Sequence, residues 1–200
     1  MKQIIIATRN QGKAREFKDF FSPFGIQALS LPELEKDLPD VEEIGTTFEE
    51  NAALKAEQIA EMLNKPVLAD DSGLVVDALD GRPGVYSARY AGKEKNDQAN
   101  MEKVLEELAD APKESRTARF VCVLAIAIPG EATIFRKGTC EGSIAFSPRG
   151  TNGFGYDPIF IPNTYSQTLA ELPKEEKNRI SHRSDAVKQL NDWVSRLAVE

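Results

Sequence analysis

The chain has 200 residues, of which 25 are Lys or Arg and 32 are Asp or Glu, so its formal net charge is −7. An acidic chain without a basic stripe is a poor candidate for sequence-independent binding to nucleic acid or to membrane surfaces, because such binding depends on neutralising phosphates. Its 41% hydrophobic and 28% charged residues are typical of a globular domain and exclude a disordered chain. The excess negative charge lies between Leu31 and Glu50, which hold eight acidic residues and one basic residue.

Neither a membrane span nor a targeting segment is evident. The apolar run Val121–Ile128 has eight residues, against the roughly 20 that a spanning helix needs. The N-terminal Ile4–Ile6 is too short for the apolar region of a signal peptide. Cys122 and Cys140 show no metal-binding or disulfide spacing, so we expect both to be reduced. These features predict a cytoplasmic protein.

Strands and helices alternate in the first part of the chain. The hydrophobic periodicity, together with capping residues such as the Thr47–Glu50 capping box, marks where each element begins. We expect strands at Gln3–Ala7 and Pro66–Asp71, and helices at Gly12–Phe21, Thr47–Leu63 and Asp97–Leu108.

Two long strands then follow each other directly. Ala118–Ile128 and Thr133–Ala145 are strand-like and flank Pro129-Gly130, a hairpin signal, and Ser184–Leu197 is expected to close the chain as a helix. Interleaved strands and helices followed by a hairpin predict an α/β fold, a mixed β-sheet flanked by helices. Because the sequence has no repeats and no clear linker, we expect residues 1–200 to form a single domain, which can consist of two lobes.

Polar residues with glycine join the first strand to the first helix, in the segment Thr8, Arg9, Asn10, Gln11, Gly12 and Lys13. Backbone N–H groups at a helix N-terminus favour an anion, and Lys13 adds a positive charge in the first turn. The segment therefore resembles a phosphate cradle, although it lacks the Walker A pattern. A simple capped helix is an equally good interpretation of this loop alone.

Two adjacent carboxylates, Asp70 and Asp71, precede Ser72-Gly73 at the end of an apolar run. Neighbouring side chains of a strand face opposite sides, so we expect one carboxylate to face the site and the other to bond to the scaffold. Carboxylates near phosphates are the usual protein ligands of Mg²⁺. The alternative is a turn in which Asp caps the backbone.

Two later segments combine polar groups in ways that packing does not require. Gly150–Pro158 contains three glycines and two aromatic residues, which suits close approach to a ligand and stacking on a flat heterocycle. Lys177–Arg183 contains the only histidine, His182, beside further donors. A glycine-rich turn with core aromatics and a solvated basic face are the structural alternatives.

Taken in order, these segments resemble the Ham1 family, the inosine/xanthosine triphosphate pyrophosphatases that hydrolyse non-canonical purine nucleoside triphosphates to the monophosphate and pyrophosphate. The matching segments span nearly the whole chain: Ala7–Lys13, Gly45–Ala56, Ala69–Leu74, Pro83–Tyr90, Gly153–Pro158 and Ser181–Arg183. The resemblance implies an elongated, inosine triphosphatase-like fold related to the Maf fold. It also implies a homodimer, a nucleoside triphosphate substrate and Mg²⁺ as cofactor, with Mn²⁺ as a possible substitute.

The resemblance also implies roles for individual residues. Asp71 corresponds to the metal ligand and general base, and Glu42 to the second metal carboxylate, with the adjacent Glu43 as the alternative register. The substrate-binding residues would be Thr8, Arg9, Asn10, Gln11, Gly12, Lys13, Lys55, Ser72, Phe154, Gly155, Tyr156, Asp157, Lys177, His182 and Arg183.

The expected reaction is attack of water on the α-phosphorus with pyrophosphate leaving, and Lys13 and Lys55 offset the developing charge. Asp70 is the alternative base, or it orients Asp71. Donors of His182 or Arg183 would bond the 6-keto group and reject adenine, but no residue is identified that rejects GTP. The rival functions are a Maf-like pyrophosphatase of pyrimidine or modified nucleotides and a nucleotide sensor without turnover.

Overall fold

A computed structural model describes residues 3–34, 38–191 and 193–194 of the chain. The chain forms two compact units. Unit 1 comprises Met1–Asp71, Val123–Lys137 and Ala186–Glu200, and unit 2 comprises Ser72–Cys122 and Gly138–Asp185. In the described part of the chain, none of the helices combines the length and the apolar character that crossing a membrane requires.

Six strands form one sheet in the order β2-β1-β3-β4-β5-β6. β1 pairs in parallel with both β2 and β3, whereas β5 and β6 are antiparallel, so the predicted mixed sheet is confirmed. β3, β4 and β5 each contribute residues to both units. The strands are β1 (Gln3–Ile6), β2 (Gln27–Ser30), β3 (Val67–Val76), β4 (Thr117–Ala127), β5 (Ile134–Ile144) and β6 (Phe160–Pro162).

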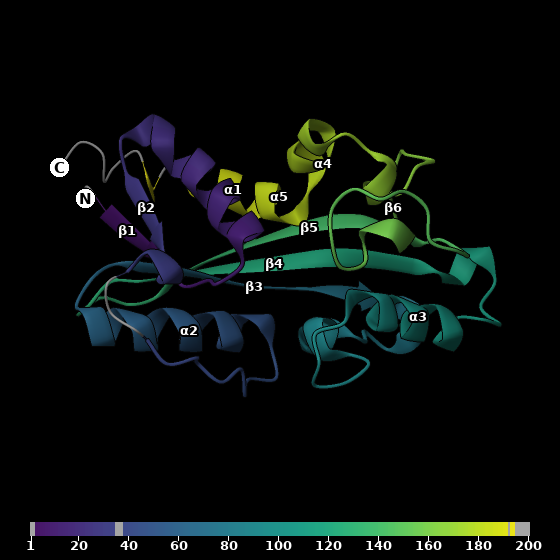
Figure 1. The fold of residues 1–200 in the computed structure, drawn as a ribbon, viewed down its shortest axis with the longest axis horizontal. Coiled ribbons are helices and arrows are strands. Elements are labelled where there is room, and N and C mark those ends of the chain that lie inside the picture. The colour runs from purple at the N-terminus through teal and green to yellow at the C-terminus, as the bar shows by residue number, and fades with distance from the viewer. Residues whose placement is uncertain (1–2, 35–37, 192, 195–200) are drawn as a thin grey trace. The chain divides into compact units, whose positions relative to one another are not determined.

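In unit 1, α1 (Gln11–Phe21) and α2 (Phe48–Leu63) flank the strands on opposite faces (Figure 1). α1 buries Ala14, Phe17 and Phe21, which recur at helical spacing, and α2 begins at the capping box predicted from the sequence. Asn64, in the left-handed conformation, ends α2. Capping residues therefore set both ends of α2.

Unit 2 contains α3 (Asp97–Glu107) and α4 (Lys174–Ile180), and α5 (His182–Lys188) begins in unit 2 and ends in unit 1 (Figure 1). Its core joins β3, α3, β4 and the 153–172 region through buried residues that include Leu74, Val104 and Phe160. Short 3₁₀ segments lie at Ser22–Phe24, Leu31–Glu33, Asp77–Leu79, Gly84–Arg89, Lys113–Ser115, Asp157–Ile159 and Leu169–Glu171.

The structure extends or adds to several predicted elements. The strand expected to end at Asp71 continues to Val76, because Leu74 and Val76 are fully buried and keep the backbone in the sheet. β2, β6 and α4 were not predicted. The C-terminal helix expected at Ser184–Leu197 begins earlier, at His182, and residues 192 and 195–197 of that prediction lie outside the described residues.

Both cysteines are buried and neither is in a disulfide, as expected. Burial, with nearby carboxylates, raises the pKa of the Cys140 thiol to about 11, so it stays protonated and unreactive at neutral pH.

Candidate active site

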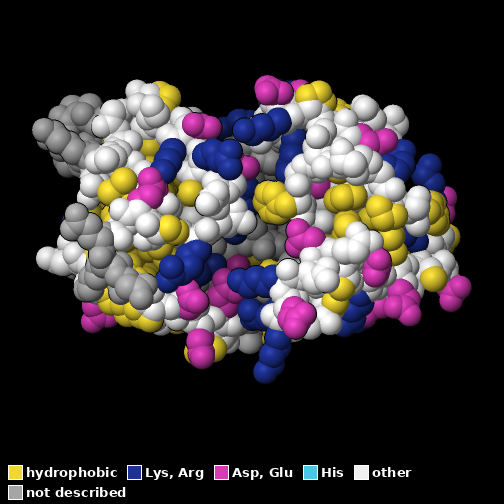
Figure 2. Space-filling view, in the orientation of Figure 1, with side chains coloured by type: hydrophobic (Ala, Val, Ile, Leu, Met, Phe, Trp, Pro, Cys, Tyr) yellow, Lys and Arg dark blue, Asp and Glu magenta, His cyan; other side chains and the backbone are white. Residues whose placement is uncertain are grey.

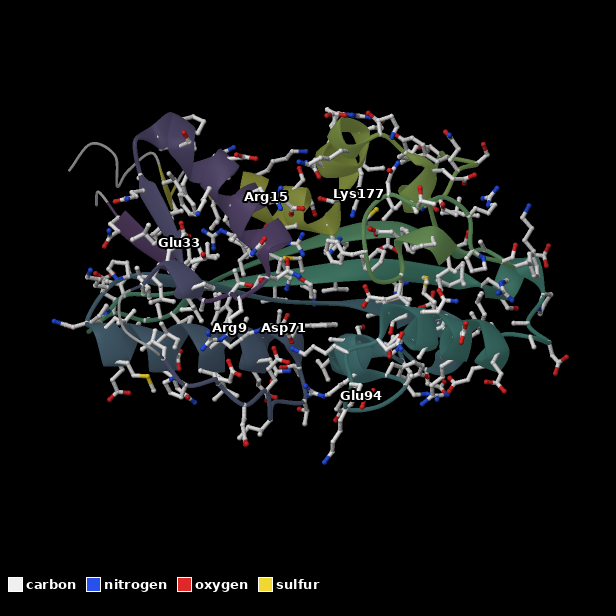
Figure 3. All side chains as sticks on the ribbon, in the orientation of Figure 1. Arg9, Arg15, Glu33, Asp71, Glu94 and Lys177 are labelled. Carbon is white, nitrogen blue, oxygen red and sulfur yellow. The ribbon has the colours of Figure 1, made fainter. Side chains whose placement is uncertain are left out.

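Two carboxylate–lysine pairs lie side by side on β3 in unit 1. Asp70 and Asp71 are 3% and 6% exposed, respectively, and Figure 3 shows Asp71 on this strand. Asp70 Oδ2 lies 2.6 Å from Lys13 Nζ, and Asp71 Oδ1 lies 3.6 Å from Lys55 Nζ. Lys13 belongs to α1 and Lys55 to α2, so the two carboxylates face opposite sides of the strand. The structure therefore confirms that neighbouring side chains of this strand, Asp70 and Asp71, face opposite sides.

Lys55 lies among several oxygens. Its ammonium group donates to Glu43 Oε1 at 2.8 Å and to the backbone carbonyl of Asp70 at 2.7 Å, in addition to its ion pair with Asp71. Burial by itself would lower the pKa of Lys55, but the negative charges of Asp71, Asp70 and Glu43 outweigh it and raise that pKa. Lys55 is therefore a permanent positive charge between carboxylates.

Asp71 is the carboxyl group with the most unusual surroundings. Burial, with the nearby charges of Glu43 and Asp70, raises its pKa to about 6, against the opposing effect of Lys55. The Asn51 side chain lies close enough to lower this pKa. Asn51 Nδ2 and Asp71 Oδ2 are nevertheless buried atoms without a hydrogen-bond partner in the structure. A buried oxygen with no hydrogen bond is ready to accept a cation or a proton.

The second acidic position distinguishes Glu43 from its neighbour. Glu43 is half-buried and bonded to Lys55, whereas Glu42, the residue first expected as the metal ligand, is exposed. Glu43 also contributes to the raised pKa of Asp71, which places its charge near that carboxyl. The structure thus brings Glu43, the alternative register, to the Lys55–Asp71 pair.

Among residues 3–34, 38–191 and 193–194, no three His, Cys, Asp or Glu side chains form a metal-ligand cluster. Mg²⁺ is usually held by one or two carboxylates, with water and substrate phosphates as the other ligands. Asp71 Oδ2 and the Glu43 carboxylate are the groups that could hold such an ion.

The Thr8–Lys13 loop caps α1 by itself. Asn10 Oδ1 accepts hydrogen bonds from the backbone N–H groups of Gly12 (2.8 Å) and Lys13 (3.1 Å), and Thr8 Oγ1 accepts from Asn10 N (3.1 Å). Arg9, labelled in Figure 3, donates to the carboxylate of Asp40 at 2.8 Å. Gln11 is exposed. The two amides that an anion would use are thus bonded to Asn10 in this structure.

Charged side chains of both signs are interspersed over the face drawn in Figure 2.

A second group of predicted residues meets in unit 2. Asp157 is 4% exposed, and its Oδ2 accepts from Phe154 N at 2.9 Å and from Lys177 Nζ at 2.5 Å. Lys177, on α4 (Figure 3), also lies 4.7 Å from the centre of the Phe154 ring. Burial raises the pKa of Asp157, while Lys177 acts against that rise. The Phe154 ring is 46% exposed and can stack on a flat heterocycle.

Gly153 and Tyr156 maintain the conformation of this loop. Gly153 has φ +78°, and a Cβ there would lie 2.0 Å from Asp157 Oδ2, so only glycine fits. Tyr156 is 5% exposed, and its hydroxyl donates to the carbonyl of Ser87 at 2.7 Å, so its ring belongs to the core. Sequence reasoning missed Ser87, although the Pro83–Tyr90 segment was matched without a role.

The remaining predicted residues lie near the start of α5. The His182 ring stacks on Phe120 with centres 4.9 Å apart and an angle of 15°. Arg183 is 5% exposed and acts electrostatically on Asp157, which places both in the same part of unit 2. Ser72 is half-buried on β3, directly after Asp71.

The comparisons with known proteins all point to the same family. The model of the Ham1 family matches residues 4–193. A protein of Oceanobacillus iheyensis named dITP/XTP pyrophosphatase is 62% identical over 194 residues, covering 97% of this chain and 98% of that protein. One of the same name from Bacillus subtilis is 58% identical, with 96% of each chain covered.

A solved structure, the Ham1 protein of Staphylococcus aureus, is also similar. It has a TM-score of 0.89 and 49% identity, covering 98% of this chain and 100% of that one. A HAM1 protein from Coxiella burnetii has a TM-score of 0.91 and 43% identity, with the same coverage. The expected fold is thereby confirmed, and the chain belongs to the Ham1 family.

Proposed function

We propose that this protein hydrolyses non-canonical purine nucleoside triphosphates (dITP, ITP and XTP) to the nucleoside monophosphate and pyrophosphate. The relatives named dITP/XTP pyrophosphatase support this activity. The observation that carries the chemistry is Asp71, a buried carboxyl with one oxygen lacking a hydrogen bond beside Lys55 and Glu43.

The triphosphate would bind to the residues of unit 1. Lys13 and Lys55 provide two positive charges, and the Gly12 and Lys13 amides provide donors at the α1 N-terminus. Because Asn10 Oδ1 holds both amides, a phosphate oxygen would replace it as their acceptor. These groups would stabilise the charge that develops on the leaving pyrophosphate.

Asp71 rather than Asp70 is the proposed general base. The Asp70 carboxylate is bonded to Lys13 at 2.6 Å, so its role is to position that lysine. Asp71 has a raised pKa, near 6, which gives it greater affinity for a proton from the attacking water. Asp71 would orient the water toward the α-phosphorus and take up its proton.

A divalent cation, Mg²⁺ with Mn²⁺ as a substitute, would neutralise triphosphate charge and polarise the phosphoryl oxygens when bound. Asp71 and Glu43 are the residues that would hold it, with Glu42 as the alternative to Glu43. The buried Asp71 oxygen and the half-buried Glu43 support the first pair.

Residues of unit 2 would bind the nucleoside. The exposed Phe154 ring would stack on the purine, and Asp157 holds Lys177 beside that ring. Donors of His182 or Arg183 would bond the 6-keto group of hypoxanthine or xanthine and remain unpaired with adenine, which rejects ATP. Ser72, Gly155 and the remaining Thr8–Lys13 residues are proposed to complete the substrate contacts.

We also propose that residues 1–200 act as a single catalytic domain, as a homodimer in the cytoplasm that binds neither nucleic acid nor membranes. The homodimer is the assembly that the resemblance to the Ham1 family implies. The measured molar mass in solution tests the dimer.

Product identification tests the function. Purified protein is incubated at fixed Mg²⁺ with XTP, dITP, ATP or dUTP, with and without EDTA, and pyrophosphate and orthophosphate are measured separately. We expect pyrophosphate from XTP and dITP only, and none in EDTA. Orthophosphate as the product would refute a pyrophosphatase, a preference for dUTP would favour a Maf-like enzyme, and binding without turnover would indicate a sensor.

A further inference from the structure

The Phe154–Asp157 loop of unit 2 is held by residues that lie outside it. The Gly155 backbone N–H donates to Asp97 Oδ2 at 2.8 Å, and the Tyr156 hydroxyl donates to the Ser87 carbonyl at 2.7 Å. The second bond is buried, so water competes little for either partner. Two consecutive loop residues thus depend on two distant positions in the sequence.

Ser87 is itself held rigidly. Its hydroxyl donates to the Gly84 carbonyl at 2.6 Å and accepts from Leu74 N at 2.9 Å, and the residue is 7% exposed. Leu74 belongs to β3, so the carbonyl that receives the Tyr156 hydroxyl is tied to a central strand. The Pro83–Tyr90 segment therefore connects β3 to the loop.

The first turn of α3 supports both connections. Asp97 is the first residue of the helix, and Asn100 is three residues further along it. The buried Asn100 side chain donates to the Ala88 carbonyl at 3.2 Å and accepts from Ala91 N at 2.7 Å. One rigid element therefore holds the loop directly and also holds the segment that contains Ser87.

The bonded residues lie between the groups proposed to meet the nucleotide. Gly155 follows Phe154, whose ring is exposed, and Tyr156 precedes Asp157, which is bonded to Lys177. The direction of the ring and of the carboxylate thus depends on the backbone at these two positions. A loop that is already ordered loses less conformational entropy when a ligand binds.

We propose that Asp97 and Ser87 are positioning residues for nucleotide binding, which hold the Phe154–Asp157 loop in its binding conformation before the nucleotide arrives. This inference rests on the proposed function, in which the loop binds the nucleoside. The Pro83–Tyr90 segment then contributes through the Ser87 carbonyl and not through contact with the substrate.

Asp97 variants provide the main test. Asp97→Ala removes the acceptor of the Gly155 N–H, whereas Asp97→Asn keeps an acceptor oxygen and removes the charge at the helix N-terminus. Asp110→Ala, at an exposed aspartate beyond the end of α3, is the matched control. Amide hydrogen exchange over residues 153–157 is measured without nucleotide, and kcat and KM are measured with XTP.

For Asp97→Ala we expect amide exchange in the loop to be about tenfold faster and KM to rise about three- to tenfold, as loss of a charge-assisted hydrogen bond implies. The kcat value should stay within about twofold, because the residues proposed for chemistry in unit 1 are unchanged. Asp97→Asn should recover most of both losses, and Asp110→Ala should match the wild type.

Tyr156→Phe tests the second connection, because it removes only the hydroxyl that Ser87 accepts. Its control is Tyr165→Phe, whose hydroxyl bonds to Glu176 on α4 and not to the Pro83–Tyr90 segment. We expect faster exchange and a higher KM for Tyr156→Phe alone.

The inference is wrong if loop exchange is unchanged in Asp97→Ala, or if exchange rises while KM for XTP does not. A fall in kcat and in melting temperature at constant KM would indicate a purely structural role and would also overturn it. Failure of the proposed function has a different signature: wild-type protein would release no pyrophosphate from XTP, while the exchange experiment would still decide whether Asp97 holds the loop.

Discussion

Asp70 and Asp71 are neighbours in the sequence, yet their carboxylates have different partners and properties. Asp70 is neutralised by Lys13 at 2.6 Å, whereas Asp71 lies 3.6 Å from Lys55 and near the charge of Glu43. Burial, with the negative charges of Glu43 and Asp70, outweighs the effect of Lys55 and raises the pKa of Asp71 to about 6, from a usual value of 3.8. At the residue scale, the proposed base is therefore a group whose ionised form is unfavourable in the folded protein.

Asp71→Asn should lower activity and raise stability together. Loss of a general base is expected to reduce kcat by about 10²–10⁴-fold. Because the folded-state pKa is raised, stability of the wild type falls as pH increases between about 4 and 6, and the loss is complete above pH 6. In EDTA at pH 8, the variant should therefore be more stable by about 3 kcal/mol.

Denaturant unfolding of both proteins at pH 4 and pH 8 measures this difference. The gain in stability should be much smaller at pH 4, because Asp71 is protonated in the folded state and nearly half protonated in the unfolded state. An equal gain at both pH values would show that the effect is not due to ionisation of Asp71.

Glu42 and Glu43 form a natural pair of matched variants. Glu43 bonds to Lys55 at 2.8 Å, while Glu42 is exposed. We expect Glu43→Gln to raise the Mg²⁺ concentration for half-maximal activity by about tenfold, as loss of one carboxylate ligand implies, and Glu42→Gln to have little effect. Magnesium titration of XTP hydrolysis measures both, and the opposite ranking would assign the metal to Glu42.

At the scale of elements, the active-site loops owe their shape to their local chemistry. The loop before α1 ends in an Asn10 cap, and α2 begins with the Thr47–Glu50 capping box. The loop in unit 2 also depends on glycine, because Gly153 and Gly155 have φ values of +78° and +61°. Side chains therefore hold all three loops, and the third additionally needs two positions without a side chain.

Gly153→Ala and Gly155→Ala separate backbone strain from steric collision. A Cβ at Gly153 would lie 2.0 Å from Asp157 Oδ2, whereas nothing lies within 4 Å of one at Gly155. Positive φ alone costs about 1 kcal/mol for alanine, so Gly155→Ala should lose about that amount. Gly153→Ala should lose about 3 kcal/mol, because it also displaces Asp157 from Lys177.

Thermal and denaturant unfolding of the two variants measures these losses. Equal destabilisation would show that Asp157 can move aside at no cost, which would contradict its tight packing against Gly153.

At the scale of the whole molecule, continuous strands link two compact units. β3, β4 and β5 each pass through both, so neither unit can unfold completely without disturbing the strands of the other.

Unit 2 also contains a buried guanidinium. Arg116 is 2% exposed and donates to the carbonyls of Leu108, Ala111, Ile144 and Ala145 at 2.7–3.4 Å.

Arg116→Met should destabilise the protein by about 2–4 kcal/mol, since it leaves several buried carbonyls without donors. The only tryptophan, Trp193, lies in unit 1 and reports on that unit. If the continuous strands couple the units, Trp193 fluorescence and far-UV circular dichroism should shift to the same lower denaturant midpoint. A shift seen by circular dichroism but not by Trp193 would show that the units unfold independently.

Helices α1, α2 and α3 and the long strands could be predicted because their signals are local. Capping residues and helical spacing mark α1, α2 and α3 in the sequence itself, and Pro129-Gly130 marks the hairpin. The short strands β2 and β6, by contrast, have three or four residues and gain their stability from the strands beside them. Their periodicity is too brief to be recognised without those neighbours.

The sequence by itself determined the family, the fold class and the candidate residues, because ordered motifs and periodic patterns are properties of the chain. Only the tertiary structure decided which residues meet. It brought Glu43 rather than Glu42 to Lys55, gave Asp70 and Asp71 separate partners, and connected Tyr156 to Ser87. Such contacts join residues 12 to 69 positions apart, and burial and pKa depend on them, so spacing along the chain could not reveal them.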